Sequence, residues 1–245
     1  MPDKLKVLDL FSGIGGFSLG LERTGGFETV AVCEIDPFCR RVLATRWPTA
    51  RQYHDVRTLN ADILAGDGIA VDIIVGGFPC QDISAAGART GLAGTRSGLW
   101  SEFGRLIGEL RPRGVIVENS PELLDNGFGD VLGTLASLGY DAQWDCIPAS
   151  AFGAPHDRDR VWIIAYPQEV ARLHEPDLRQ ELRRWLSNDN HPWATDAWDA
   201  PEAAVCRVDD GIPHRVDRTG ACGNAVIPQI PELIGRAILE SERAA

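Results

Sequence analysis

The sequence predicts an α/β protein with a mostly parallel, twisted sheet and helices on both of its faces. Two observations predict this fold class. Short apolar runs alternate with stretches of helical periodicity along the chain, and such alternation builds a parallel sheet between two layers of helices. A glycine-rich turn follows the first apolar run, as in folds that bind nucleotides at the first strand-to-helix turn. With 245 residues, the chain is long enough to bury one core and to carry a small appendage.

Each predicted strand is a short run of mostly apolar residues. In chain order the predicted strands are 5–11, 28–34, 71–76, 113–118, 142–147 and 160–166. Helices are predicted where apolar residues recur at helical spacing, near 15–23, 37–47, 99–110, 128–138 and 231–243. In the last of these helices one stripe is apolar, which predicts packing against the core; it holds Leu233, Ile234, Ala237 and Ile238.

The glycine-rich turn is the first candidate binding site. Gly13, Gly15 and Gly16 follow the first strand, where glycine permits a tight turn close to a bound nucleotide. Such a turn alone is weak evidence, because glycines serve many tight turns that bind nothing. The next strand ends in Glu34, whose carboxylate can accept hydrogen bonds from ribose hydroxyls, and Asp55 could accept one from an adenine amino group.

Cys80 is the most informative residue of the chain. It lies within residues 76–84, where a glycine pair and a proline turn the chain sharply and hold the thiol at a fixed angle. A second apolar run ends in Glu118, and a third is preceded by Arg158 and Arg160. Because groups at the carboxyl ends of parallel strands converge on one crevice, we expect the thiol, the carboxylate and the two arginines to lie together.

These residues also have structural explanations. An isolated cysteine is more often a small buried hydrophobe than a nucleophile. Glu118 can serve as a helix-start acid, and Arg158 or Arg160 can pair with Asp157 or Asp159 on a solvated strand edge. The joint presence of all the segments in one order favours a functional site.

In that order, the segments resemble the cytosine-C5 DNA methyltransferases. The resemblance covers most of residues 5–166 and resumes at 223–228, which is similar to the closing motif of the family. It implies a Rossmann-like class I methyltransferase fold. Residues 1–167 and 221–245 are then the catalytic domain that binds S-adenosylmethionine. Residues 168–220 are a short target-recognition region, which resembles that of compact methyltransferases of phages and mobile elements.

The resemblance also implies the chemistry. Cys80 would attack carbon 6 of cytosine in DNA, so that carbon 5 becomes electron-rich enough to take a methyl group from S-adenosylmethionine. Glu118 would donate to N3 and Arg160 to O2, with Arg158 in support. The implied donor-binding residues are Phe11, Gly13, Gly15, Gly16, Glu34, Ile35, Asp55, Pro79, Leu99, Asn224 and Val226.

Composition bears on the expected partners. The net charge of −11 conflicts with a DNA partner, although Arg89 and Arg96 lie in residues 82–98, which resemble the mobile catalytic loop of the family. No stretch approaches the roughly 20 apolar residues of a membrane span, and no leader precedes the first strand. The six cysteines show no zinc spacing. We therefore expect a monomer that acts on double-stranded DNA in the cytoplasm of a bacterial or phage-infected cell, without metal or membrane.

Three other functions remain open from the sequence. A tRNA cytosine-C5 methyltransferase would share the same chemistry and motif order. A nicotinamide-dependent oxidoreductase would explain the glycine turn and Glu34, but it gives Cys80 and Glu118 no shared task. A DNA-binding protein without catalytic activity would be expected to have lost the nucleophile, whereas Cys80 is present in the sequence. Two departures from the family pattern, Ser120 and His156, adjoin the expected pocket and could retune base contacts or rate.

Overall fold

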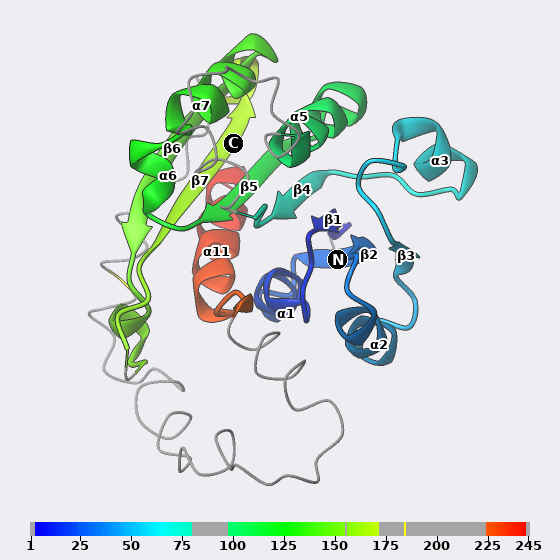
Figure 1. Ribbon diagram of the computed structural model, residues 1–245, viewed down its shortest axis with the longest axis horizontal. Helices are drawn as coiled ribbons and strands as arrows, with labels where there is room; N and C mark the ends of the chain where they lie inside the picture. The colour runs from blue at the N-terminus through cyan, green and yellow to red at the C-terminus, as the bar shows by residue number, and fades with distance from the viewer. Residues whose placement is uncertain (1–2, 80–97, 155, 172–183, 185–223, 244–245) are drawn as a thin grey trace, which may run out of the picture.

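The computed structural model describes residues 3–79, 98–154, 156–171, 184 and 224–243, and within them seven strands form one sheet (Figure 1). The strands are β1 (Leu5–Leu10), β2 (Phe27–Cys33), β3 (Arg51–Tyr53), β4 (Ile73–Gly76), β5 (Gly114–Asn119), β6 (Tyr140–Ile147) and β7 (Arg160–Pro167). The helices are α1 (Gly16–Arg23), α2 (Pro37–Arg46), α3 (Ala61–Gly66), α5 (Gly98–Leu110), α6 (Glu122–Asp125), α7 (Phe128–Ser137), α8 (Gln168–Ala171) and α11 (Gln229–Arg243), with a 3-10 turn η2 (Ala149–Phe152). The predicted α/β class is confirmed.

The sheet has the order β3-β2-β1-β4-β5-β7-β6, and a single one of these strands is reversed. Strands β1 to β5 pair in parallel, whereas β7 pairs antiparallel with both β5 and β6. Because β7 runs against its neighbours, its first residues lie at the same edge of the sheet as the last residues of β4 and β5. The mostly parallel sheet that the sequence predicts is therefore correct, with one exception that shapes the site.

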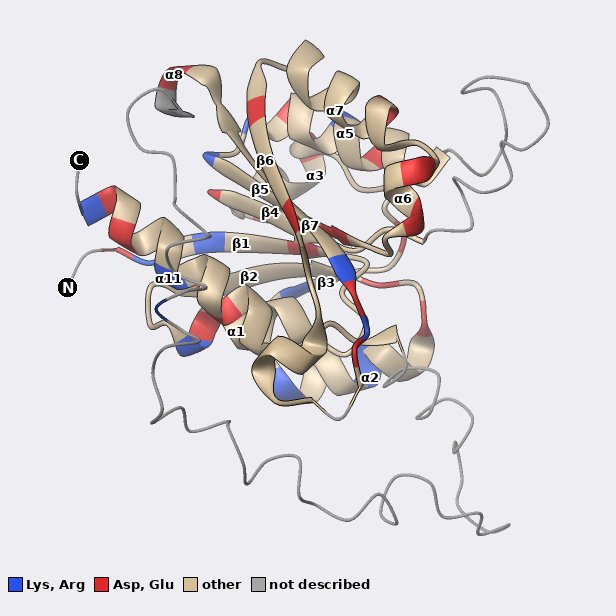
Figure 2. Ribbon diagram, turned by 90° about the vertical axis from the view of Figure 1, so that its left-hand side faces the viewer, with Lys and Arg blue, Asp and Glu red and all other residues tan. Residues whose placement is uncertain are grey.

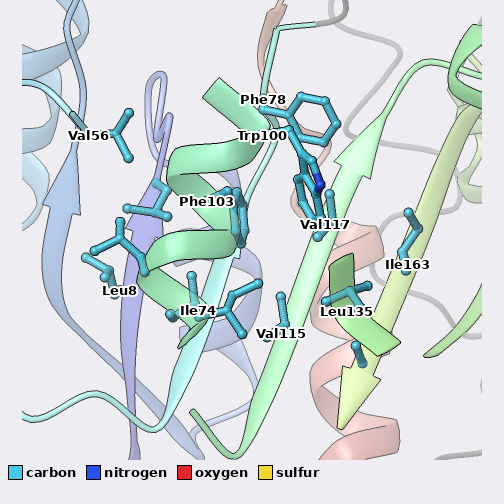
Figure 3. Close-up of a cluster of buried hydrophobic side chains, with 14 of the residues drawn as sticks. Leu8, Val56, Ile74, Phe78, Trp100, Phe103, Val115, Val117, Leu135 and Ile163 are labelled. Carbon is cyan, nitrogen blue, oxygen red and sulfur yellow. The ribbon is translucent and has the colours of Figure 1, made fainter. Parts of the chain in front are cut away.

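Helices cover both faces of this sheet (Figure 1). On one face, α5 and α7 supply Phe103 and Leu135 to a core cluster that Figure 3 shows in close-up. On the other face, α1 and α11 supply Phe17 and Leu233 to a second cluster. Neighbouring strand residues point to opposite clusters, Val7 to the second and Leu8 to the first. This explains why the strands read as nearly continuous apolar runs.

The last helix packs against the first. A Cβ atom at Gly20 of α1 would lie 2.2 Å from the Pro228 carbonyl oxygen, so only glycine allows this approach of the two segments. Ile234 and Ile238 of α11 are buried in the same cluster as Leu21 of α1. Residues from the two ends of the described chain thus build one core, as the apolar stripe of the last helix predicts.

The predicted elements agree with the observed bounds to within two residues at every end. Strand β3 and helices α3, α6 and α8 were not predicted, because three to six residues are too few for a periodic pattern. The predicted recognition region, 168–220, lies outside the described residues apart from α8 and Arg184. Arg184 pairs with Glu240 of α11 at 2.5 Å.

Candidate active site

Glu118 and Arg160 meet at the edge where β5 ends and β7 begins. Arg160 Nε lies 3.0 Å from Glu118 Oε1, and the Glu118 side chain is 13% exposed. Arg160 Nη1 also donates to the Asp159 carbonyl oxygen at 2.7 Å. The antiparallel pairing places Glu118 opposite Trp162 and Asn119 opposite Val161, which sets Arg160 level with the end of β5. Two predicted site residues are therefore in direct contact.

The environment of Glu118 changes its acidity. Burial raises the pKa of the Glu118 carboxyl above its ordinary value, and the charges of Arg160 and Arg158 offset only part of this rise. The group consequently holds a proton to a higher pH than an exposed glutamate does. A carboxyl in this condition can donate a hydrogen bond as well as accept one.

Arg158 joins the start of β7 to the segment that precedes α11. Its Nη2 atom donates to the Ala225 carbonyl oxygen at 3.0 Å, and its φ of 30° is unusual for a residue other than glycine. Burial and the neighbouring Arg160 lower the pKa of Arg158. Of the two other predicted residues on this segment, Asn224 is exposed and Val226 is partly buried against the core. Ala225, which Arg158 contacts, lies between these two residues in the sequence.

The segment after β4 is fixed against Glu118 and Asn119. A Cβ atom at Gly77 would lie 2.6 Å from Glu118 Oε2, so the backbone passes directly beside the carboxylate. The buried Asn119 donates from Nδ2 to the Phe78 carbonyl oxygen at 3.0 Å. Pro79 is exposed at the end of this segment, and Cys80 lies outside the described residues. The chain is thus anchored immediately before the predicted nucleophile.

Asn119, which forms a motif pair with Glu118 in the sequence, was not among the predicted catalytic or donor-binding residues. Its Oδ1 atom accepts from the Ser120 N–H at 2.8 Å, while Nδ2 holds the Phe78 carbonyl. Its place directly after Glu118 was the available signal. Ser120, the departure from the family pattern, thereby takes part in the turn through its backbone.

The glycine turn is held by the end of β2. The Gly13 N–H donates to Glu34 Oε2 at 2.7 Å, and the Asp36 N–H donates to Glu34 Oε1 at 2.8 Å. Phe11 and Gly13 both have a φ of 53°, in the left-handed region, and Phe11 stacks on Phe103 with ring centres 6.3 Å apart. A Cβ atom at Gly13 would have no neighbour within 4 Å. The turn therefore leaves open space beside a fixed carboxylate, which fits a nucleoside.

The other two predicted glycines have packing partners. A Cβ atom at Gly15 would lie 2.3 Å from Trp47 Cζ3, and one at Gly16 would lie 2.3 Å from the Val226 carbonyl oxygen. Gly15 also has a φ of 87°. Both positions require glycine for the fold, whatever they do for a ligand.

Asp9 lies beneath this turn and was also missed. Its buried carboxyl accepts from Ser18 Oγ at 2.7 Å and from the Ser18 backbone N–H near the start of α1. Burial raises the pKa of Asp9 to about 7, although the Ser18 hydrogen bonds oppose the rise. A polar residue within an apolar strand is the only sequence signal at this position.

Two further predicted residues lie on the neighbouring loops. Ile35 is 64% exposed directly after Glu34, which leaves an apolar side chain available to cover a flat ring. Asp55 pairs with Arg57, whose Nη2 lies 2.6 Å from Asp55 Oδ2, and this pairing lowers the pKa of Asp55. Leu99, at the start of α5, is partly buried against the core. Arg57 was not anticipated as the partner of Asp55.

A cleft of about 280 Å³ adjoins the site on the side of α11. Arg23, His156, Arg158 and residues 225–229 line it, whereas Glu118 and Arg160 do not. Figure 2 shows basic and acidic positions alternating along the segment that leads into β7. His156, the second departure from the family pattern, is exposed at this cleft.

The part of the chain that the structure describes lacks two kinds of feature. Among those residues, no three histidine, cysteine, aspartate or glutamate side chains gather as metal ligands would. Nor does any helix there have the length and apolar character that crossing a bilayer requires.

Comparison with known proteins links this geometry to a family. A model of the family described as C-5 cytosine-specific DNA methylase matches residues 5–198. The Type II methyltransferase M2.BsuMI of Bacillus subtilis (strain 168) is 36% identical over 189 residues, which are 71% of this chain and 47% of that protein. The chain spans about half the length of the curated relatives it matches.

Solved structures show the same fold. A protein from an E. coli prophage, described as a DNA modification methyltransferase, superposes with a TM-score of 0.58 at 31% identity, covering 70% of this chain and 50% of that one. DNMT2 of Spodoptera frugiperda, in a mutant form, superposes with a TM-score of 0.58 over 98% of both chains. At 15% identity, the second likeness concerns the fold alone.

Proposed function

Because the chain belongs to the C-5 cytosine-specific DNA methylases, we propose that it transfers a methyl group from S-adenosylmethionine to carbon 5 of cytosine in double-stranded DNA. One observation carries the proposal. The Glu118 side chain, which is 13% exposed, pairs with Arg160 and leaves no room for a Cβ atom at Gly77, three residues before Cys80. A nucleophile, a group that can carry a proton and a cation are the three parts that this reaction needs.

Cys80 begins the reaction as a thiolate and forms a bond to carbon 6 of the target cytosine. Glu118 donates a proton to N3 as negative charge moves into the ring, and its raised pKa supports that role. Arg160 donates to O2, where charge also develops. Carbon 5 then carries the electron pair that forms the new bond to the methyl carbon. Loss of the carbon 5 proton to water restores the double bond between carbons 5 and 6 and expels Cys80 as a thiolate, and Glu118 recovers the N3 proton.

The donor site comprises the edge of β1 and β2. When bound, S-adenosylmethionine supplies an electrophilic methyl group on a sulfonium. The open space beside Gly13 and the fixed Glu34 carboxylate support binding of the ribose there. The exposed Ile35 side chain supports packing against the adenine ring. Asp55 accepts from the adenine amino group. The remaining contacts come from Phe11, Gly15, Gly16, Pro79, Leu99, Asn224 and Val226.

The nucleic acid partner follows from the chemistry. Carbon 6 is shielded within a duplex stack, so the cytosine must leave the helix, at a cost of a few kcal/mol that pocket contacts offset. Residues 168–220 serve as the recognition region beside a catalytic domain of residues 1–167 and 221–245. Arg89 and Arg96 meet phosphates, so affinity falls steeply with salt. The bacterial relatives named Type II methyltransferases support a role in restriction and modification. We expect the protein to act as a monomer in the cytoplasm.

A trapping experiment tests the proposal. The protein is incubated with labelled S-adenosylmethionine and a duplex that contains 5-fluorocytosine, where the fluorine cannot leave as a proton does. A covalent protein–DNA adduct is expected from the wild type and from the control Cys146→Ser, and none from Cys80→Ser. An adduct with Cys80→Ser would mean that the nucleophile is another residue. A parallel arm with fluorinated tRNA separates the RNA alternative, because trapping in that arm alone would reassign the substrate.

A further inference from the structure

The cleft beside α11 concentrates basic side chains in a chain whose net charge is −11. Arg23 of α1 lines it, as do His156 and Arg158 of the segment before β7 and residues 225–229. None of the described residues that line the cleft is acidic. Because a concave site whose walls carry one sign of charge attracts ions of the other sign, the lining favours an anionic ligand.

Arg158 is fixed on the wall of this cleft. Its bond to the Ala225 carbonyl oxygen, at 3.0 Å, uses one of the five N–H donors of the guanidinium. Burial lowers the pKa of Arg158 and the charge of Arg160 lowers it further, whereas the charge of Glu118 raises it. The protonated Arg158 is thus disfavoured by a second cation nearby, and an anion in the cleft would stabilise it.

Arg23 adds a second guanidinium, whose partner carboxylate is shared. Arg23 Nη1 lies 3.9 Å from Glu232 Oε2, whereas Arg236 Nη2 lies 2.7 Å from Glu232 Oε1. Two cations therefore flank one buried carboxylate, and these three groups together carry one excess positive charge. Since 29% of the Arg23 side chain is exposed and Arg23 lines the cleft, a ligand there can reach it.

Two polar side chains complete the lining. His156 is exposed, and its imidazole has at least one N–H donor in either protonation state. Gln229, the first residue of α11, is 6% exposed, and its buried Oε1 atom has no hydrogen-bond partner within the described residues. Such an atom marks a place where a polar partner is missing from the described part of the chain. The cleft therefore has the polar lining of a binding site.

The size of the cleft and its donors favour a phosphate group. Pockets for drug-sized ligands begin at roughly 300 Å³, and this cleft of about 280 Å³ is smaller. Two guanidinium groups and an imidazole need several acceptor oxygens, which phosphate provides in greater number than a carboxylate does. Guanidinium groups also bind phosphate oxygens through paired N–H···O bonds. Glu118 and Arg160 do not line the cleft, and neither do Gly13 and Glu34, so this space is separate from the sites described above.

We propose that the cleft lined by Arg23, His156 and Arg158 is a binding site for a phosphate group, separate from the pocket for the cytosine and from the turn for the methyl donor. Two sources share this chemistry, free phosphate and a backbone phosphate of DNA. Binding of free phosphate does not depend on the proposed function, whereas binding of the DNA backbone does. Neither requires Cys80, so this inference and the proposed nucleophile can fail separately.

A titration with inorganic phosphate tests the site. Phosphorus NMR of the full chain, in a phosphate-free buffer with ionic strength held constant by sodium chloride, measures the dissociation constant. The proteins are the wild type, Arg23→Met, His156→Gln and the control Arg113→Met. Arg113 pairs with Glu242 and does not line the cleft. His156 is exposed, so its replacement leaves the core intact, and thermal melts of all four proteins show whether each is folded.

We expect Arg23→Met to weaken phosphate binding about tenfold or more, as the loss of a hydrogen bond from a charged group warrants. His156→Gln should weaken it about two- to tenfold, and Arg113→Met should bind as the wild type does. If the wild type fails to bind phosphate, or if Arg23→Met binds it as tightly as Arg113→Met, the inference is overturned.

A second arm identifies the source of the phosphate. Duplex DNA is added to the wild type with phosphate bound, and duplex affinity is then measured across a range of salt concentrations. Displacement of the phosphate assigns the site to the DNA backbone, and Arg23→Met should then lower the slope of log affinity against log salt by about one. Phosphate that stays bound beside the duplex assigns the site to free phosphate.

Discussion

Arg160 Nε lies 3.0 Å from Glu118 Oε1, across two strands that run in opposite directions. Were β7 parallel to β5, its first residues would lie at the far edge of the sheet. Reversal of this one strand brings a cation to a carboxylate that burial already holds more protonated than usual. The contact holds the cation and the carboxylate together at one edge of the sheet.

Replacement of Glu118 should separate chemistry from folding. Glu118→Gln keeps the shape and the contact with Arg160 but removes the proton donor, so the methylation rate should fall about 10²- to 10⁴-fold. The melting temperature should change little, because the exchange removes a carboxylate that burial disfavours. Single-turnover methyl transfer and thermal melts measure the two effects. The exposed Glu122→Gln is the matched control, and a loss as small in Glu118→Gln as in this control would remove Glu118 from the mechanism.

Gly77 tests the approach of the backbone to Glu118. In Gly77→Ala the new Cβ atom would lie 2.6 Å from Glu118 Oε2, so either the carboxylate or the segment before Cys80 must shift. We expect the rate of adduct formation to fall about 10²-fold, as small misplacements of reacting groups do. Gly133→Ala in α7 is the control, because its Cβ atom meets nothing within 4 Å. Equal rates for the two variants would show that the contact is not needed.

Asn119 anchors the same segment from the other side. Asn119→Ala leaves the buried Phe78 carbonyl oxygen without the Nδ2 donor, which costs about 1–3 kcal/mol of stability. Trapping of the 5-fluorocytosine adduct should slow about 10-fold or more, while S-adenosylhomocysteine should bind as it does to the wild type. Time courses of adduct trapping measure the first effect, and calorimetry of S-adenosylhomocysteine binding measures the second. A parallel loss of donor affinity would indicate general damage to the fold.

Gly16 tests whether the glycine turn is needed for packing. Gly16→Ala would place a Cβ atom 2.3 Å from the Val226 carbonyl oxygen, and relief of that overlap requires backbone movement. We expect the free energy of unfolding to fall by about 1–3 kcal/mol, the usual cost of overpacking. Urea denaturation measures it, with Gly66→Ala as the control because no atom lies within 4 Å of its Cβ position. Loss of donor affinity without loss of stability would instead assign Gly16 to the ligand alone.

Asp9 should produce a pH dependence of stability. The folded protein raises the pKa of Asp9 from 3.8 to about 7, so folding favours its protonated form. The contribution to the free energy of unfolding is therefore greatest below pH 4, falls as the pH rises to about 7, and is constant above that. Asp9→Asn stays neutral, so its free energy of unfolding should not show this fall. Between pH 4 and pH 8, the free energy of unfolding of the variant should therefore rise by up to about 4 kcal/mol relative to that of the wild type. Urea unfolding across this range measures the difference, and two parallel curves would contradict the assignment.

The fold could be predicted because its strands are apolar runs and its main helices are amphipathic. Strand β3 could not, since Arg51–Tyr53 is too short and too polar for a periodic signal. The meeting of Glu118 and Arg160 was expected from the convergence of carboxyl ends, yet Arg160 stands at the start of its strand. Strand direction depends on the pairing of β6 with β7, which spacing along the chain does not reveal.

The candidate site was predicted in part. Motif order identified Glu118, Arg160 and Glu34, each of which the structure places at the expected edge of the sheet. The roles of Asn119 and Asp9 depend on the burial of their side chains. A polar residue within an apolar run of the sequence does not show whether its side chain is buried. The pairing of Asp55 with Arg57 depends on the turn geometry. The assignment of Cys80 as nucleophile stays a prediction.

The docking of α11 onto α1 has a consequence for how the protein folds during translation. Phe17 and Leu21 emerge early during translation, while Leu233 and Ile234, which cover them, emerge some two hundred residues later. Contacts this distant in sequence slow folding, because a long loop must close before they form. The nascent chain therefore carries an uncovered apolar surface until α11 has been made, and chaperones that shield such surfaces have that interval in which to act.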